Sequence, residues 1–229
     1  MTIRTETAAT APHRAPHRAA PRDARETDRA LPLATVRTLA ASAHVGDLVF
    51  IRVPVRLFRE VADATGTWTN HVGIVVDTSG AEPVVAESTF PWAKLTPLTR
   101  FVQRSEGGRL ALARLATPPT ADEQRRMQAA AERRIGTLYD TGFNLRSRRQ
   151  FCSRYVREVL GDATGIEVGD VETFSTLLAR RPGAKLGFWR LWYFGRIPWA
   201  RETVTPASLL RCGRLTLEFD GVVFDPRRG

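Results

Sequence analysis

The order of strand-like and helix-like segments limits the fold of this chain more than any other feature of its sequence. Runs rich in β-branched and aromatic residues come first, at 46–55, 72–76, 83–88 and 109–115. Segments with helical signals follow them, and turn residues separate the strand-like runs. A block of strands followed by a block of helices indicates an α+β fold rather than a doubly wound parallel sheet.

The helical signals begin at Thr120. Together with Glu123 it forms a capping-box pattern, which predicts a helix that runs to about Gly136. The other predicted helices cover 149–160 and 171–181, and one more begins at Thr205-Pro206.

Two further stretches lie toward the C-terminus. The run "LTLEFDGVVF" (215–224) predicts a hairpin that turns at Asp220-Gly221. The stretch 185–201 mixes arginines with three tryptophans, a composition that suits either a membrane interface, an acyl-chain groove or an aromatic cap over the core.

The chain divides into a tail and a body. Residues 1–30 contain no large apolar residue after Ile3 and are expected to be disordered. Residues 31–229 are expected to form a single domain, since a body of roughly 200 residues buries about 70% of its unfolded surface without a disulfide or a metal. The chain contains two cysteines and no apolar run typical of a signal peptide or a membrane span, so we expect a soluble protein of the reducing cytoplasm.

The positive charge belongs mainly to the body. The net charge is +10, and the six arginines and four acids of residues 1–30 contribute +2 of it, which leaves +8. Such a charge favours an anionic partner, such as a phospholipid surface or an acidic substrate, unless it is only a solvated arginine-rich surface. The sequence disfavours nucleic acid as a partner, because it contains neither an aromatic-basic RNA motif nor a clear helix-turn-helix.

A histidine opens the strand-like run "NHVGIVV" (70–76) in a chain that has only four histidines. If this run and "PVVAES" (83–88) form a hairpin centred on Ser79, His71 lies directly opposite Glu87, with Cβ atoms about 5 Å apart. A carboxylate bonded to one ring nitrogen fixes the tautomer and leaves the other nitrogen free as a base. The alternative is a surface His–Glu pair, and a one-residue bulge would separate the two side chains.

A base at His71 requires a partner, which is a metal, a hydroxyl or a thiol. The sequence shows no HExxH, no CxxC and no second histidine placed to bind a metal. Cys152 lies on one helical stripe with Val156 and Leu160, near the predicted helix start, where the dipole lowers a thiol's pKa. The alternative for Cys152 is an inert buried thiol.

Other charges and caps around Cys152 affect this expectation. Arg149 and Arg154 would lower the pKa of the thiol further. A capping box of Ser147 and Gln150 would place Cys152 about one turn inside the helix, which weakens the effect of the dipole.

Three motifs stand in a specific order: "GDLVFI" with "NHVGIVV", then "VVAEST", then "FCSRYV". In this order they resemble the YebB-type permuted papain-like cysteine enzymes, related to the NlpC-type peptidases and lecithin retinol acyltransferase. The resemblance implies a circularly permuted papain-like fold, in which an antiparallel sheet packs against the cysteine-bearing helix.

The resemblance also implies roles for individual residues. Cys152 would be the nucleophile, His71 the base and Glu87 the residue that orients the imidazole. Phe151 stands where some relatives have tyrosine, so Tyr139 and Gln150 become candidates for a substrate or oxyanion contact.

The implied activity is that of a cofactor-free and metal-free cysteine hydrolase, amidase- or peptidase-like, that cleaves an amide or ester through an acyl-enzyme. The substrate, whether small molecule, peptide or lipid, stays open. One alternative is a lipid-surface acyltransferase or phospholipid amidase. Another is a non-enzymatic basic binding module in which Cys152 is merely buried.

Overall fold

A computed structural model describes residues 31–181, 183–184 and 186–224 of the chain. The tail predicted to be disordered, residues 1–30, lies outside these residues. Seven strands form one sheet in the order β1-β9-β6-β2-β3-β4-β5, and two more form a separate ladder, β7-β8. The strands are β1 (Leu33–Thr35), β2 (Leu48–Ile51), β3 (His71–Asp77), β4 (Val84–Ser88), β5 (Ala93–Pro97), β6 (Arg109–Leu115), β7 (Glu172–Thr173), β8 (Glu202–Thr203) and β9 (Leu215–Phe224). The predicted α+β class is confirmed.

The large sheet is mixed, whereas the sequence predicted an antiparallel one. Strands β2 to β6 and β9 pair antiparallel, but the short edge strand β1 runs parallel to β9 and pairs with its last three residues. Sequence patterns missed β1 because three residues give no usable alternation.

The predicted hairpin at 215–224 is wrong. These residues form the single strand β9, with Asp220 and Gly221 opposite Ala111 and Leu110 of β6. A side chain at 221 would meet the carbonyl oxygen of Pro32 at 2.2 Å. The glycine therefore permits close approach of the chain beside β9 rather than a turn.

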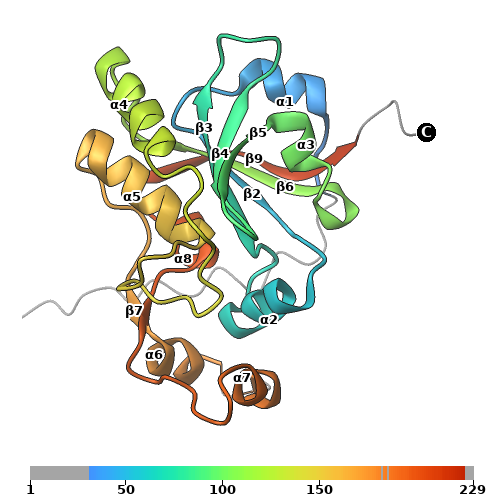
Figure 1. The fold of residues 1–229 in the computed structure, drawn as a ribbon. Coiled ribbons are helices and arrows are strands. Elements are labelled where there is room, and N and C mark those ends of the chain that lie inside the picture. The colour runs from blue at the N-terminus through green and yellow to red at the C-terminus, as the bar shows by residue number, and fades with distance from the viewer. Residues whose placement is uncertain (1–30, 182, 185, 225–229) are drawn as a thin grey trace, which may run out of the picture. The chain divides into compact units, whose positions relative to one another are not determined.

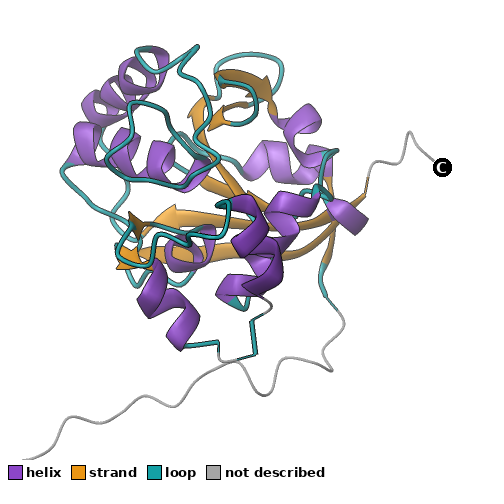
Figure 2. Ribbon diagram, turned by 60° about the horizontal axis from the view of Figure 1, so that its bottom comes forward, coloured by secondary structure: helices purple, strands orange, loops and turns teal. Residues whose placement is uncertain are grey.

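Helices cover both faces of the sheet (Figures 1 and 2). They are α1 (Val36–Ser42), α2 (Arg56–Thr65), α3 (Leu98–Val102), the 3₁₀ turn η2 (Glu106–Gly108), α4 (Ala121–Glu132), α5 (Cys152–Thr164), α6 (Phe174–Ala179), α7 (Leu186–Trp192) and α8 (Pro206–Leu210). Alternate residues of each strand face opposite cores: Phe50, Val72 and Ile74 pack with α4 and α5, whereas Val49 and Val75 pack with α1 and α3.

The helix starts differ in how their free amides are capped. In α1, α4, α6 and α8 a threonine precedes the helix and its side chain accepts a bond from the third helical amide; these are Thr35, Thr120, Thr173 and Thr205. The start of α5 has no such cap, because Phe151 occupies that position. The predicted box of Ser147 and Gln150 does not form, and Cys152 is the first helical residue. The helix dipole therefore acts on the thiol more directly than the sequence indicated.

The segment from α6 to α7 lies beside α2, at the end of the sheet where β3 begins (Figure 1). The predicted helix at 171–181 is shorter than expected, because its first residues pair with β8 as strand β7. Among the described residues, none of the helices has the length and hydropathy that crossing a membrane requires.

Candidate active site

The site begins with a histidine and a carboxylate on neighbouring strands. Strand β3 pairs with β4 so that Ile74 lies opposite Ala86, which is two residues away from the predicted register. A shift of two residues keeps every side chain on its face, so Glu87 becomes a diagonal neighbour of His71 rather than its direct partner. The two side chains still meet, with 2.7 Å between His71 Nε2 and Glu87 Oε2.

Glu87 is fully buried and bonded on both oxygens. Arg104 Nη2 donates to Oε1 and Oε2 at 2.8 Å each, and Thr96 Oγ1 donates to Oε1 at 2.6 Å. Burial alone would raise the pKa of Glu87, but the bond and charge of His71, the charge of Arg104 and the Thr96 bond lower it to about 2. Glu87 is therefore ionised at neutral pH.

Sequence reasoning did not identify Arg104 or Thr96. Thr96 lies on β5, a strand that the sequence patterns missed, and Arg104 follows α3 in a stretch without any local motif. Both reach Glu87 only because the sheet brings β5 and the end of α3 beside β4.

The His71 ring lies where the two cores meet. Phe101 of one core stacks on it at 5.6 Å between ring centroids, and Phe58 of the other lies 6.1 Å away. These contacts fix the ring plane, while Glu87 fixes the tautomer. The remaining nitrogen, Nδ1, is buried and makes no conventional hydrogen bond. It is the nitrogen left to face the thiol.

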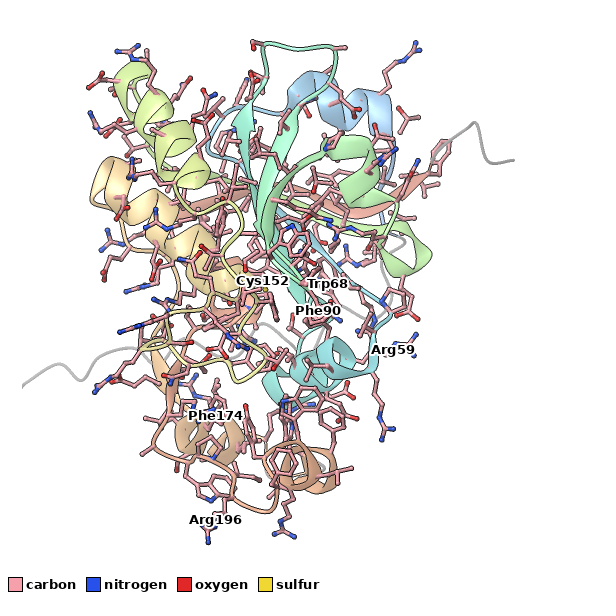
Figure 3. All side chains as sticks on the ribbon, in the orientation of Figure 1. Arg59, Trp68, Phe90, Cys152, Phe174 and Arg196 are labelled. Carbon is pink, nitrogen blue, oxygen red and sulfur yellow. The ribbon has the colours of Figure 1, made fainter. Side chains whose placement is uncertain are left out.

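Cys152 is almost fully buried and begins α5 at the lower ends of the strands, as labelled in Figure 3. Burial raises the pKa of the Cys152 thiol, but the hydrogen bond and charge of His71, together with the backbone amides of Val72 and Ser153, lower it overall. Burial lowers the pKa of His71, but the interactions with Cys152 and then with Glu87 raise it to about 9. The pair therefore favours a thiolate beside an imidazolium.

The arginines predicted to act on the thiol, Arg149 and Arg154, are not among the groups that chiefly set its pKa. Arg154 bonds instead to Glu158 and to the carbonyls of Ser147 and Arg149. The interactions that lower the pKa of Cys152 come from His71 and backbone amides.

Tyr139 and Gln150, both candidates for an oxyanion or substrate contact, behave differently. The Tyr139 hydroxyl is buried, interacts with the thiol and the backbone amide of Cys152, and has no conventional hydrogen-bond partner. Burial and the neighbouring thiolate raise its pKa well above the ordinary value, so it stays protonated as a donor. Gln150 is not brought to the thiol: its amide nitrogen donates to Glu158 at 2.6 Å. Its backbone carbonyl instead fastens the loop by accepting from Ser88 Oγ and the Asp140 amide.

An apolar pocket adjoins the thiol. Its wall comes from α2, α6, α7 and the loop before α5, and it includes Phe143, Phe151, Phe174, Trp189, Tyr193 and Ile197. Tyr139 and Cys152 line it too, and none of the described residues lining it is charged. In a chain in which 25% of the residues are charged, this wall favours an uncharged, apolar group next to the sulfur.

The described residues do not form a metal centre of His, Cys, Asp and Glu side chains. Among residues 31–181, 183–184 and 186–224, no three or more His, Cys, Asp or Glu side chains are grouped so that they could hold an ion. His71 Nε2 is already bonded to Glu87, and Glu87 is bonded to Arg104.

Residues 42–217 match a family described as "Permuted papain-like amidase enzyme, YaeF/YiiX, C92 family". A protein of Escherichia coli (strain K12), described as uncharacterized protein YiiX, is 26% identical over 184 residues, which cover 80% of this chain and 90% of that protein. A crystal structure described as that of the metalloprotein YiiX from Escherichia coli O157:H7 has a TM-score of 0.69 to this chain. It is 23% identical in sequence, and the superposition covers 78% of this chain and 98% of that one.

These matches agree with the order of the site along the chain. The histidine strand precedes the cysteine helix, which is the permuted order that the sequence resemblance indicated. The group that matches is YaeF/YiiX, where the sequence had suggested the YebB type. The chain belongs to the YaeF/YiiX family of permuted papain-like amidase enzymes.

Proposed function

We propose that this protein is a cysteine-dependent hydrolase of an amide or ester, with Cys152 as nucleophile, His71 as base and acid, and Glu87 as the orienting carboxylate. The observation that supports it best is the buried relay Glu87–His71–Cys152, with a bond of 2.7 Å at its first step and mutual pKa shifts at its second. A carboxylate, an imidazole and a thiol in this sequence are the parts of a papain-like nucleophile.

The first half of the reaction forms an acyl-enzyme. His71 Nδ1 takes the thiol proton, and the sulfur of Cys152 attacks the carbonyl carbon to form a C–S bond. The carbonyl oxygen gains negative charge and accepts hydrogen bonds from the Tyr139 hydroxyl and the Cys152 amide, which interact with each other beside the sulfur. The C–N or C–O bond then breaks, and the imidazolium of His71 gives its proton to the leaving group.

The second half releases the acyl group. Water gives a proton to His71 and attacks the thioester carbon, the C–S bond breaks, and the sulfur leaves as a thiolate that pairs again with the imidazolium. Glu87 stays ionised throughout, because its pKa of about 2 lies far below that of the imidazole. Its role is to stabilise the imidazolium and to hold the ring.

The pocket beside Cys152 supports a restriction on the substrate. Its uncharged wall of aromatic and aliphatic side chains suits an apolar group on one side of the scissile bond. This fits a lipid acyl amide or ester, so a phospholipid amidase or a lipid-surface acyltransferase is the second candidate function. In an acyltransferase, a hydroxyl or amine of a second substrate replaces water in the second half.

Two other readings receive less support. A basic binding module does not require a buried thiol and imidazole that shift each other's pKa. The crystallised YiiX is described as a metalloprotein, which suggests a bound metal, but the described residues of this chain provide no fitting set of metal ligands. No step of the proposed reaction uses a metal.

Both cysteines are free thiols, in keeping with a proposed location in the reducing cytoplasm.

Labelling with a fluorescent iodoacetamide, followed by peptide mapping, tests the proposal. Cys152 should react at pH 7 in preference to Cys212, and His71→Gln, which keeps most of the side-chain volume, should slow this reaction at least tenfold. His44→Gln is the matched control, since His44 is exposed and far from the site along the chain. Equal labelling of the wild type and a folded His71→Gln protein would show that His71 does not activate Cys152, and would refute the proposed function.

A further inference from the structure

The segment that contains α7 exposes large apolar side chains on the side away from the pocket. Phe194 is 96% exposed and Leu191 78%, and Trp192 and Trp199 are partly exposed. Figure 3 places this segment at the end of the molecule farthest from the upper loops, with Arg196 pointing outward. We call residues 186–199 the apolar tip.

The backbone presents one of these side chains to solvent. Phe194 has a φ of 49°, a left-handed conformation that phenylalanine rarely adopts. It follows the last turn of α7 and directly precedes Gly195, which also has a positive φ. The turn at the end of α7 therefore carries a phenyl ring that is almost fully exposed.

The opposite side of the same helix belongs to the active-site pocket. Trp189 is buried, Tyr193 is partly buried, and both line the pocket beside Cys152. Trp189 stacks on Tyr193, and Phe188 stacks on Trp192. One short helix thus joins an outer apolar surface to an inner apolar wall.

The charge around the apolar tip has a single sign. Residues 174–201 contain six basic residues and no aspartate or glutamate. Arg190 and Arg196 are exposed, and no carboxylate of the described residues forms an ion pair with either. Tryptophans and arginines around protruding aliphatic and phenyl side chains are the composition of a surface that lies in a lipid interface.

Other occupants fit this surface less well. Residues 1–30 and 225–229 could supply little apolar cover, because Met1 and Ile3 are the only Val, Ile, Leu, Met, Phe, Trp or Tyr in these two stretches. A second copy would bring its own arginines against these, and each copy has a net charge of +10. The charge instead complements an anionic surface.

We propose that the apolar tip docks the protein on an anionic lipid surface, with Leu191 and Phe194 inserted among the acyl chains and Arg190 and Arg196 at the headgroups. This inference does not depend on which bond the enzyme cleaves. The docking would place the substrate at the lipid surface, because α7 contributes both to the pocket wall and to the lipid-facing surface.

Co-sedimentation of the full chain with vesicles tests the proposal. The wild type should bind phosphatidylcholine vesicles that contain phosphatidylglycerol at low salt, and binding should weaken at high salt and without the anionic lipid. The double variant Leu191→Glu/Phe194→Glu should bind at least tenfold more weakly. Leu217→Glu is the matched control, because Leu217 is an exposed leucine on β9 that lies outside the tip.

Three outcomes would overturn the proposal: no binding of the wild type to anionic vesicles at low salt, equal binding by the double variant, or dimerisation in solution that the double variant abolishes. Iodoacetamide labelling of Cys152 in the same samples shows whether the active site is intact. Because neither Leu191 nor Phe194 lines the pocket, loss of vesicle binding with normal labelling would separate docking from catalysis.

Discussion

Replacing Glu87 by glutamine removes the negative charge at one end of the relay and keeps the side-chain volume. The pKa of Glu87 is lowered from 4.5 to about 2 in the folded protein. A difference of that size corresponds to about 3 kcal/mol of stabilisation at neutral pH, since each pKa unit is worth about 1.4 kcal/mol. We therefore expect Glu87→Gln to unfold at lower denaturant concentration, with a loss of about 3 kcal/mol in the free energy of unfolding.

The pH dependence of this loss follows from the direction of the shift. A lowered folded-state pKa means that the wild type has the full contribution above pH 4.5 and loses it as the pH falls through about 2. Glu87→Gln should lack this component, so the two proteins should approach each other in stability at acid pH. Urea unfolding at several pH values, followed by tryptophan fluorescence, measures the difference.

The same variant should change the reactivity of the thiol. Glu87 is one of the two groups that raise the pKa of His71 to about 9. A hydrogen bond to a charged partner contributes about 1.5–3 kcal/mol, so its loss should lower the pKa of the imidazolium by about one to two units. The rate of the iodoacetamide reaction of Cys152 should be constant with pH while the thiolate faces an imidazolium. In Glu87→Gln this plateau in the rate should end at a lower pH than in the wild type.

A matched variant separates this effect from the general cost of losing a carboxylate. Glu82 accepts bonds from the amide and hydroxyl of Thr99 and does not contact the relay. Glu82→Gln should lose only about 1 kcal/mol and keep the wild-type alkylation profile. If Glu87→Gln also keeps that profile and its stability is unchanged, the reasoning about the relay is refuted.

Two further variants test the groups around the relay. Tyr139→Phe removes a hydroxyl that has no conventional hydrogen-bond partner, so it should leave stability unchanged but lower ester turnover about 100-fold. The control Tyr155→Phe loses the bond to the Ala131 carbonyl and should instead cost about 1 kcal/mol of stability. Equal turnover in Tyr139→Phe and the wild type would exclude the oxyanion role. Arg104→Met removes the two hydrogen bonds from Arg104 Nη2 to Glu87. It should lower stability by about 2 kcal/mol and shift the acid limb of the alkylation profile to higher pH, whereas Arg104→Lys should restore most of the profile. Identical profiles in the Met and Lys variants would contradict a positioning role.

The sequence predicted those parts of the site that depend on local pattern. The cap at Thr120 and Glu123 was visible because it lies within four residues. The meeting of His71 and Glu87 was predicted from strand parity, which survives a register error of two. Cys152 was identified from its helical stripe, although the helix start was placed too early.

The parts that sequence reasoning missed depend on contacts between distant segments. The hairpin of β3 and β4 turns beyond Ser79, and its register shifts once more between Val75 and Asp77; no residue type announces either feature. Gly221 looked like a turn residue, whereas it makes room for the chain beside β9. Arg104 has no local signature, because its function arises only from the sheet edge that it meets.

The open start of α5 has a consequence for anyone who tries to stabilise this protein. Putting Ser, Thr or Asp at a bare helix start is a standard remedy and adds about 1 kcal/mol. At position 151 such a side chain would compete with the sulfur of Cys152 for the same first-turn amides, one of which, that of Ser153, helps to lower the thiol's pKa. Phe151 is moreover fully buried, so replacing it by a small polar residue would lose about 3 kcal/mol or more of packing, which exceeds the gain from a cap. Stability and thiol chemistry therefore both require this helix start to keep its apolar residue.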